Sequence, residues 1–467
     1  MRKHLFSILA AASLWLSGCT LAPDYTRPEA PVPQAWPGGE AYKDPAPEAP
    51  SAVSLQWGSF FTDPKLREII RTALANNRDL RLASLNVDRA RAMYRIQQAE
   101  LVPSLGASAS GSRGRTPGDL TSSGHATTGE QWRVEAGVSA WEIDFFGRIR
   151  SMAQSALESY FASEHARRSA QILLVSEVAN AWLALAADRE NLKLARSTLE
   201  SQQASYNLIR RRHEVGISTE LDLRQVQTRV ESARVDVAKY TGLVAQDENA
   251  LNLLAGSPVR SDLLPEGLGA VASIPDVSPG LSSSVLLYRP DILEAESTLK
   301  AAYADIGAAR AALFPRISLT TALGSASSDL TGLFQAGSFV WNYAPQMTMP
   351  IFDPRAWSAL KVTKVNREIA VAQYEKAIQA AFREVADELA RRGTLGDQIG
   401  AQQSLVDATA ESYRLSSLRY DKGTDTYLNV LDAQRSLYGA QQGLISLQLA
   451  RLSNQVSLYK VLGGGDE

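Results

Sequence analysis

Hydrophobic residues recur along much of the chain at alternating spacings of three and four. The longest stretch runs from Arg148 to Val215, contains neither Gly nor Pro, and carries such residues at Val175, Ala179 and Trp182. This spacing predicts one α-helix, roughly 100 Å long at 1.5 Å per residue, which is more than a single globular core needs. A pattern this long without caps is typical of a coiled coil or a helical tube.

The long helical pattern turns back on itself and then occurs again later in the chain. Its return after a Gly predicts an antiparallel helical hairpin over about 148–255, and a second one is predicted over about 355–463. Gly393, Gly396 and Gly400 interrupt the second copy, so we expect local softening or a change of packing there.

The segments ahead of both helical hairpins alternate with a period of two. Apolar residues recur at every second position from Trp132 to Ala140 and from Phe339 to Tyr343, and Ile317, Leu319, Thr321 and Leu323 alternate in the same way with only Thr321 polar. The alternation predicts β-hairpins over about 103–141 and 315–349, with strands near the length of a tilted membrane strand. Trp and Tyr near the strand ends fit an aromatic girdle at a bilayer surface, although a buried soluble sheet also uses them.

The two halves repeat one another. Gly147 and Gly216 lie 69 residues apart, as do Pro354 and Gly423. We therefore predict two structural repeats, 57–255 and 289–463, each a helix, a β-hairpin and a long helical hairpin. A Gly, Pro and Ser rich linker over 256–288 is expected to join them.

The N-terminus resembles a bacterial lipoprotein signal. Arg2 and Lys3 precede a short apolar run, and Leu16, Ser17 and Gly18 lead to Cys19, the only Cys of the chain. We expect residues 1–18 to be removed and Cys19 to carry a covalent lipid; an ordinary signal peptide with a chance Cys is the alternative. Eight prolines in 19–56 favour an extended, poorly packed tether.

Composition narrows the classes of function. With 48 Lys and Arg against 50 Asp and Glu, 45% hydrophobic residues and no basic patch, the chain of 467 residues is neither wholly disordered nor expected to bind nucleic acid. One Cys and four scattered His give no metal-ligand spacing. We find no nucleophile elbow and no phosphate loop, and therefore expect no enzyme, no metal and no cofactor beyond the lipid on Cys19.

No further stretch is expected to form a membrane helix, because charge interrupts each candidate run. A membrane-spanning region must then consist of strands closed into a barrel. Four strands are too few to close one, so closure must involve several copies of the chain: two copies supply eight strands and three supply twelve. About eight strands give a barrel filled by its own side chains, whereas twelve could enclose water.

Several motifs are similar to those of one known family. They are Trp57 to Pro64, Asp144 to Arg148, Arg419 and Tyr420 with Gly423, Leu431 to Arg435, and Leu462 to Gly465. On these motifs the chain resembles the outer-membrane efflux proteins, the TolC-like outer-membrane factors, and more closely the OprM-like lipoprotein branch of multidrug efflux systems. The resemblance covers essentially all of the mature chain.

The resemblance implies a fold and a function. The expected fold is mostly α with membrane β, in a homotrimer whose 12-stranded β-barrel in the outer membrane continues as a 12-helix periplasmic α-barrel. The expected function is the outer-membrane channel of a tripartite efflux pump, a passive gated duct that exports small molecules such as drugs and toxic compounds. The implied partners are a periplasmic adaptor protein, an inner-membrane pump that we expect to be proton-driven, and outer-membrane lipid.

The resemblance also carries roles over to individual residues. The periplasmic gate would consist of Leu428, Asp432, Asn429, Asp222 and Tyr420, while Gly216, Ser218, Thr219, Gly423 and Thr424 would contact the adaptor. Asp425 stands where one relative has Arg, and Asn429 stands where some relatives have an acid. Without the resemblance, the acids are solvated helix faces and the glycines are plain turns.

Three alternative functions stay open at this stage. A duct for type I protein secretion or for heavy-metal efflux would share the same architecture. A lipid-anchored periplasmic coiled-coil adaptor would explain the helices and the signal but not the paired alternating segments.

Overall fold

The computed structural model describes residues 20–43, 55–280 and 282–464. The predicted signal peptide and the predicted lipidation site Cys19 lie outside these residues. The chain forms two compact units built from interleaved segments. Unit 1 comprises Met1–Glu29, Asn86–Glu164 and Glu294–Glu375, and unit 2 comprises Ala30–Leu85, His165–Leu293 and Lys376–Glu467.

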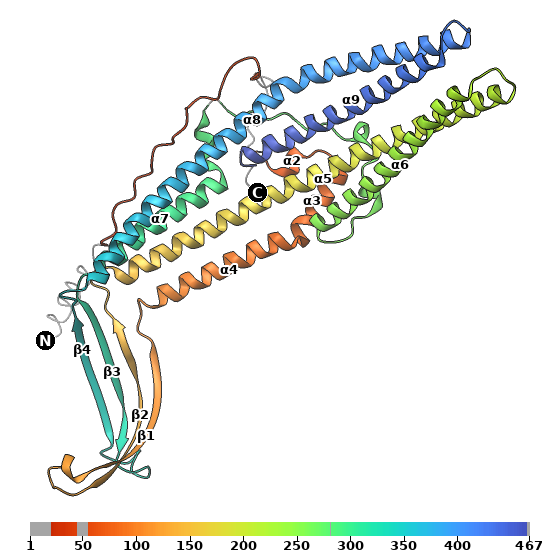
Figure 1. Ribbon diagram of the computed structural model, residues 1–467. Helices are drawn as coiled ribbons and strands as arrows, with labels where there is room; N and C mark the ends of the chain where they lie inside the picture. The colour runs from red at the N-terminus through yellow and green to blue at the C-terminus, as the bar shows by residue number, and fades with distance from the viewer. Residues whose placement is uncertain (1–19, 44–54, 281, 465–467) are drawn as a thin grey trace. The chain divides into compact units, whose positions relative to one another are not determined.

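Long helices and four strands make up most of the fold (Figure 1). The elements of the first half are α2 (Trp57–Phe60), α3 (Pro64–Asn76), α4 (Arg78–Ala99), β1 (Leu105–Thr116), η2 (Gly118–Leu120), β2 (Thr127–Glu142), α5 (Arg148–Glu214) and α6 (Glu220–Ala255). The crossing segment holds η3 (Ser261–Leu263), η4 (Leu268–Ala270) and η5 (Ser283–Tyr288). The second half contains α7 (Pro290–Ala311), β3 (Arg316–Ser327), β4 (Phe339–Thr348), α8 (Pro354–Asp421) and α9 (Tyr427–Val461).

The two halves match element by element. Helices α4 and α7 each have 22 residues, α5 and α8 have 67 and 68, and α6 and α9 have 36 and 35. The expected order of helix, β-hairpin and long helical hairpin is therefore present in each half. Helix α8 is continuous through Gly393, Gly396 and Gly400, so these glycines do not end the helix.

The four strands of unit 1 form one antiparallel sheet in the order β1-β2-β3-β4 (Figure 1). Residues pair as Leu105 with Val138 and as Arg316 with Thr348, and a bulge interrupts the β2–β3 pairing between Val138 and Trp141. Only β2 and β3 have neighbours on both sides. Strands β1 and β4 are the two edges of the sheet, so each has one row of backbone groups without a partner strand among the described residues.

Helix α5 buries an apolar stripe in unit 2. Its buried residues follow the predicted helical spacing and include Val175, Ala179, Trp182 and Ala186. The Trp182 indole also donates a hydrogen bond of 3.2 Å to the carbonyl oxygen of Leu263, which fixes the crossing segment against α5. In unit 1, by contrast, Val362 and Val365 on α8 are about half exposed on the single chain, so the predicted apolar stripe is not buried along its whole length.

One segment of α5 has a composition close to that of a membrane helix, although Glu177 lies within it. An 18-residue window in this helix has a mean hydropathy of 1.5 and is apolar enough to span a bilayer by length and composition. Since 56% of the window is buried inside the protein, its apolar residues serve as core.

The Pro-rich segment is extended, as expected, but it is not poorly packed. In unit 1 its residues 20–29 dock on α5 and α7 through side chains and backbone. The Leu21 carbonyl accepts from Arg310, and the Thr20 and Ser151 hydroxyls lie 3.3 Å apart. Arg27 pairs with Glu296 at 2.7 Å. Because these contacts replace hydration of an exposed chain, residues 20–29 form part of unit 1.

Glu296 is the centre of this docking site. Its side chain is only 3% exposed and accepts from Tyr25 at 3.0 Å and from Arg27, and it pairs with Lys300 at 3.1 Å. Burial alone would raise the pKa of Glu296, but the hydrogen bonds from Arg27, Lys300 and Tyr25 outweigh it and hold the pKa below its usual value. The carboxylate is therefore charged and fully engaged at neutral pH.

The rest of the segment, residues 30–43, docks on α8 and the crossing segment in unit 2. The Trp36 ring stacks on Phe382 with centroids 5.2 Å apart, and the Gln34 carbonyl accepts from the Ser283 N–H at 2.8 Å. Gly393 of α8 lies directly under the Ala41 backbone, where any Cβ would collide with the Ala41 carbonyl oxygen. The change of packing expected at this glycine is therefore a close backbone approach.

We predict that Arg27→Ala releases the docked segment. The change leaves the buried Glu296 carboxylate with fewer partners, at a cost of about 2 kcal/mol. Subtilisin should then cleave residues 20–43 of the folded protein roughly tenfold faster or more. The stabilisation that ionised Glu296 gives to the docked segment is fully present at pH values above the ordinary pKa of a carboxyl group. It is lost as the pH falls through the lowered pKa of Glu296, so the segment should also be cleaved faster in acid.

The matched control is Lys43→Ala, which removes an exposed pair with Asp397 at 2.5 Å. An exposed pair contributes about 0 to 1 kcal/mol, so the cleavage rate should change by less than about fivefold. Equal rates for the two variants would contradict the role assigned to Glu296.

Candidate functional site at the tips of the helical hairpins

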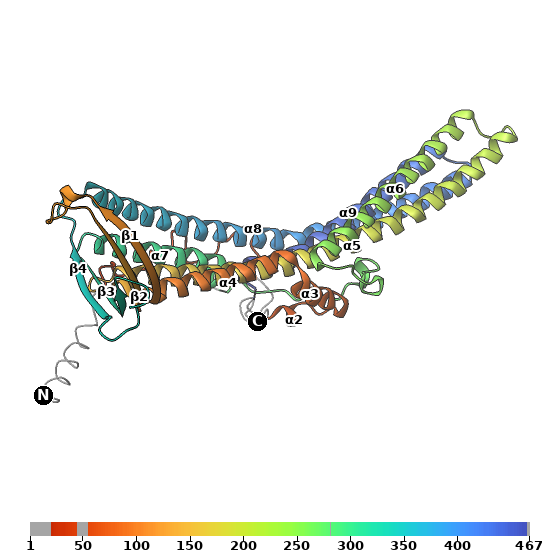
Figure 2. The ribbon, with the colours of Figure 1, turned by 90° about the horizontal axis from the view of Figure 1, so that it is seen from below.

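The two helical hairpins of unit 2 end in tips with the same backbone geometry (Figure 2). In the first tip Gly216 has φ +78°, the Ile217 N–H donates to the Arg212 carbonyl at 2.8 Å and the Gly216 N–H donates to that of His213 at 2.9 Å. This pair of bonds is the Schellman arrangement, in which a left-handed residue closes the end of a helix. Gly provides that conformation without strain.

The second tip repeats the arrangement around Gly423, which has φ +74°. The Thr424 N–H donates to the Arg419 carbonyl at 3.0 Å, and the Gly423 N–H donates to the Tyr420 carbonyl at 2.9 Å. A Cβ on either Gly216 or Gly423 would meet no atom within 4 Å. The two glycines are thus required by backbone conformation, and the surface over them is open.

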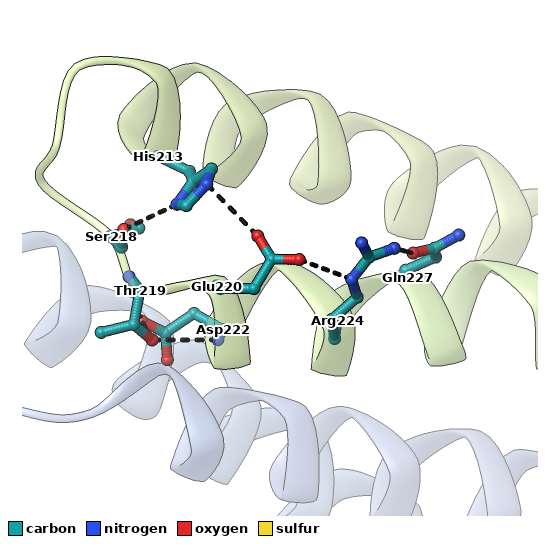
Figure 3. A network of polar contacts seen from close by, with 7 residues as sticks. All are labelled: His213, Ser218, Thr219, Glu220, Asp222, Arg224 and Gln227. Carbon is teal, nitrogen blue, oxygen red and sulfur yellow. Dashed lines mark hydrogen bonds and ion pairs between the residues drawn. The ribbon is translucent and has the colours of Figure 1, made fainter.

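The returning helices start differently. Thr219 caps α6 by accepting from the Asp222 N–H at 3.1 Å, while the Asp222 carboxylate accepts from the Thr219 N–H at 3.0 Å (Figure 3). This reciprocal pair is a capping box, which stabilises the first turn of a helix. Thr426, at the same place before α9, makes no side-chain capping bond. The first tip is therefore the better capped of the two.

In the second tip, Asp425 replaces that cap with contacts to both sides of the turn. Its carboxylate accepts from Asn429 at 2.6 Å and pairs with Arg419 at 3.2 Å. The hydrogen bonds from Asn429 and from the Thr426 N–H hold the pKa of Asp425 below its usual value. Asn429 is thus engaged inside its own hairpin.

Tyr420 connects the two hairpins within the chain. Its hydroxyl accepts from Arg212 at 2.7 Å, and the Arg212 guanidinium lies 5.2 Å from the Tyr420 ring centroid. The ring also packs on Tyr427, with centroids 4.9 Å apart. Further along, Gln434 donates to Ser201 at 3.3 Å. The hairpins are therefore joined by polar contacts near their tips, with an Arg–Tyr pair closest to the end.

The remaining predicted gate residues lie on α9 and α6. Leu428 is about half exposed, and Asp432 lies 3.4 Å from Arg435 on the same helix. Among the described residues Asp222 contacts Thr219 of its own hairpin and is not brought to Tyr420. The structure thus brings Asn429 together with Asp425 and Tyr420 together with Arg212, while Leu428, Asp432 and Asp222 are not joined to each other.

Sequence reasoning missed Arg212 as the partner of Tyr420, and it missed the contacts of His213 and Glu220. The Thr219 to Asp222 spacing is a capping-box signal that could have been recognised from sequence. The Arg212–Tyr420 contact had no such signal, because it joins residues 208 positions apart. Within the described ranges, no group of three or more His, Cys, Asp or Glu side chains could hold a metal ion.

Comparison with known proteins identifies the family. The model of the outer membrane efflux protein family matches residues 69–257 and 281–464. The two matched stretches correspond to the two halves of the fold, and the second begins within the crossing segment, just before η5.

Three similar proteins represent the matches. The antibiotic efflux pump outer membrane protein ArpC and the toluene efflux pump outer membrane protein TtgC, both of Pseudomonas putida, are each 49% identical over 467 residues, covering 100% of this chain and 96% of the relative. The solved open state of the Neisseria gonorrhoeae MtrE outer membrane channel is 37% identical, with a TM-score of 0.85 over 96% of this chain and 98% of that one.

These matches confirm the expected family, the fold of long helices with few strands in two repeats, and the absence of an enzymatic role in this family. They also agree with the helical hairpins and the four-stranded sheet described above. The chain therefore belongs to the outer membrane efflux protein family, and it is the outer-membrane channel of an efflux pump, reaching from the outer membrane into the periplasm.

Proposed function

We propose that three copies of this chain form one gated duct that carries small molecules, antibiotics and organic solvents among them, out of the cell. The observation that carries the proposal is the combination, in one chain, of a four-stranded sheet with two open edges and a pair of long helical hairpins. The substrate class rests on the antibiotic and toluene pumps to which ArpC and TtgC belong by name.

The open sheet edges support a trimer. Three sheets joined edge to edge, β4 of one copy to β1 of the next, give a closed barrel of twelve strands and leave no unpaired backbone in lipid. Apolar side chains of α4 and α8 that are exposed on the single chain, such as Leu82, Met93 and Val362, would be covered by neighbouring copies. The helical hairpins of three copies would then supply a tube of twelve helices.

We propose a lipoprotein organisation for the N-terminus. Residues 1–18 would be removed and Cys19 acylated, after which residues 20–43 dock as described. The remaining divisions are the repeats 57–255 and 289–463, joined by the linker 256–288. Docking of Thr20 and Leu21 on unit 1 supports an anchor held close to the protein surface.

The gate of the duct would lie near the hairpin tips. Leu428 supplies an apolar side chain, Asp432 supplies an acid, and Asn429 and Asp222 set the local geometry of their hairpins. Three copies of Asp432 around a narrow lumen would attract cations and repel one another. The Arg212–Tyr420 contact would oppose that repulsion, because it holds the second hairpin against the first within each copy.

The tips would also bind a periplasmic adaptor protein that couples the duct to an inner-membrane pump, which we expect to be proton-driven. Gly216 and Gly423 leave open surfaces, and Ser218, Thr219 and Thr424 border them with hydroxyl groups. The names of ArpC and TtgC favour a drug or solvent pump over type I secretion or heavy-metal efflux. A coiled-coil adaptor as the identity of this chain is not supported, since the four-stranded sheet would then have no use.

We predict that Tyr420→Phe opens the duct in planar bilayers. If three copies open together, losing one hydrogen bond of about 1 kcal/mol in each shifts the ratio of closed to open channels roughly a hundredfold.

Leu428→Ala and Asp432→Ala should raise single-channel conductance, because they widen the constriction. Asp407→Ala, an exposed acid earlier on α8, is the matched control and should change neither property. Unchanged gating and conductance in all three tip variants would locate the constriction elsewhere.

We predict that a photo-crosslinking amino acid at Thr219 or Thr424 captures a periplasmic adaptor in living cells. Mass spectrometry of the captured protein distinguishes the substrate classes, because drug-pump, metal-pump and secretion adaptors differ in sequence. The same crosslinker at Asp407 tests whether capture is confined to the tips. Recovery of no adaptor from either tip would contradict the proposed contact.

A further inference from the structure

His213 occupies an unusual position at the first tip. It lies in the last turn of α5, and both of its ring nitrogens face oxygen atoms of the returning chain (Figure 3). Nδ1 lies 3.0 Å from the carbonyl oxygen of Ser218, and Nε2 lies 3.3 Å from a carboxylate oxygen of Glu220. The ring therefore bridges the end of α5, the tip loop and the start of α6.

The hydrogen-bonding capacity of imidazole decides which protonation state fits this bridge. A backbone carbonyl and an ionised carboxylate are both acceptors only. Neutral histidine has one N–H donor, so one of its nitrogens would face an oxygen with lone pair against lone pair. The imidazolium ion donates from both nitrogens and satisfies both oxygens. A protonated ring would thus make both contacts favourable, a hydrogen bond to Ser218 and an ion pair with Glu220, whereas a neutral ring could donate to one of them only.

Some charged groups around His213 favour a positive charge on its ring, and others disfavour it. The carbonyl groups at the end of α5 favour a cation in its last turn. Glu220 attracts the ring but also binds Arg224 at 2.7 Å, which shares its charge. Arg210, Arg211 and Arg212 precede the ring on α5; the first pairs with Glu214 at 3.6 Å and the last turns to Tyr420 of α8. On α6, Asp222 is taken up by the capping box with Thr219.

The tip loop depends on His213 through its backbone as well. The His213 carbonyl accepts the Gly216 N–H that closes the Schellman turn, while the ring holds the Ser218 carbonyl two residues further on. If the ring lost one of its two contacts, the loop between Gly216 and Thr219 would be held by the ring at one end only. Conformation of the loop and charge of the ring are therefore linked.

We propose that His213 is a pH-dependent contact. When its ring is protonated it holds the first tip in the conformation described above, and when the ring is neutral the tip loop becomes less constrained. The inference rests on the proposed adaptor contact and adds its regulation. Histidine changes charge between about pH 5 and 8, so periplasmic acidification favours a preformed tip. A preformed surface binds a partner with less loss of conformational freedom.

The second tip provides an internal comparison. At the corresponding places it carries Tyr420, Lys422 and Asp425, and residues 415–430 contain no histidine. Its turn is closed by the same backbone bonds around Gly423. A response to pH should thus be confined to the first hairpin.

The test is hydrogen–deuterium exchange of the full-length protein in detergent micelles at about pH 5.5 and 7.5, corrected for the intrinsic pH dependence of exchange. Peptides covering residues 208–224 report on the tip amides. We expect about threefold greater protection at the lower pH, the size of one partly exposed ion pair. Residues 415–430 should show no change. Because no partner is present, the outcome is independent of whether an adaptor binds.

Three variants make the test specific. His213→Gln should abolish the pH response at 208–224, and Glu220→Gln, which keeps the ring, should reduce it. His125→Gln, in the loop between β1 and β2, is the matched control and should retain it. Burial and the nearby Asp188 raise the pKa of Asp247 to about 6, so peptides that contain these two residues are evaluated separately. Equal protection at both pH values, or an unchanged response in His213→Gln, would overturn the proposal.

Discussion

The unpaired backbone at the two edges of the sheet is the constraint on which the rest of the structure depends. Strands β1 and β4 each present N–H and C=O groups that no other strand in the described part of the chain satisfies. In lipid such groups cost several kcal/mol each, so the sheet is complete only when further copies close it. Repetition of one unit twice in the chain is a direct way to supply strands and helices in matching numbers. The near-equal lengths of α5 and α8, and of α6 and α9, follow from that requirement.

The repeat preserves backbone geometry more closely than side-chain chemistry. Both hairpins turn through a left-handed glycine with the same two backbone bonds. Around those turns the first half uses a capping box and a histidine bridge, whereas the second uses an aspartate that contacts an arginine and an asparagine. The turn is thus the shared solution to ending a long helix, and the side chains around it are free to differ.

Sequence patterns were sufficient for the elements and insufficient for the contacts between them. Period-two alternation and long runs without Gly or Pro identified the strands and hairpins, because these signals are local. The docking of residues 20–43 was missed, since proline content predicts extended chain without saying what the chain lies on. Two partners of Glu296, Tyr25 and Arg27, lie about 270 positions earlier, and Arg212 and Tyr420 are 208 positions apart. No local pattern specifies such pairs.

The close approach of Ala41 to Gly393 has a consequence for how the N-terminal segment can vary. Gln34 is tied to Ser283 by backbone hydrogen bonding, and seven positions later Ala41 lies over a glycine that admits no side chain. The number of residues between these two points is therefore fixed by geometry. Insertions and deletions are usually tolerated in proline-rich surface segments. Here, a change of one residue between Gln34 and Ala41 would place the wrong backbone atoms over Gly393. Length, more than composition, is what this segment must keep.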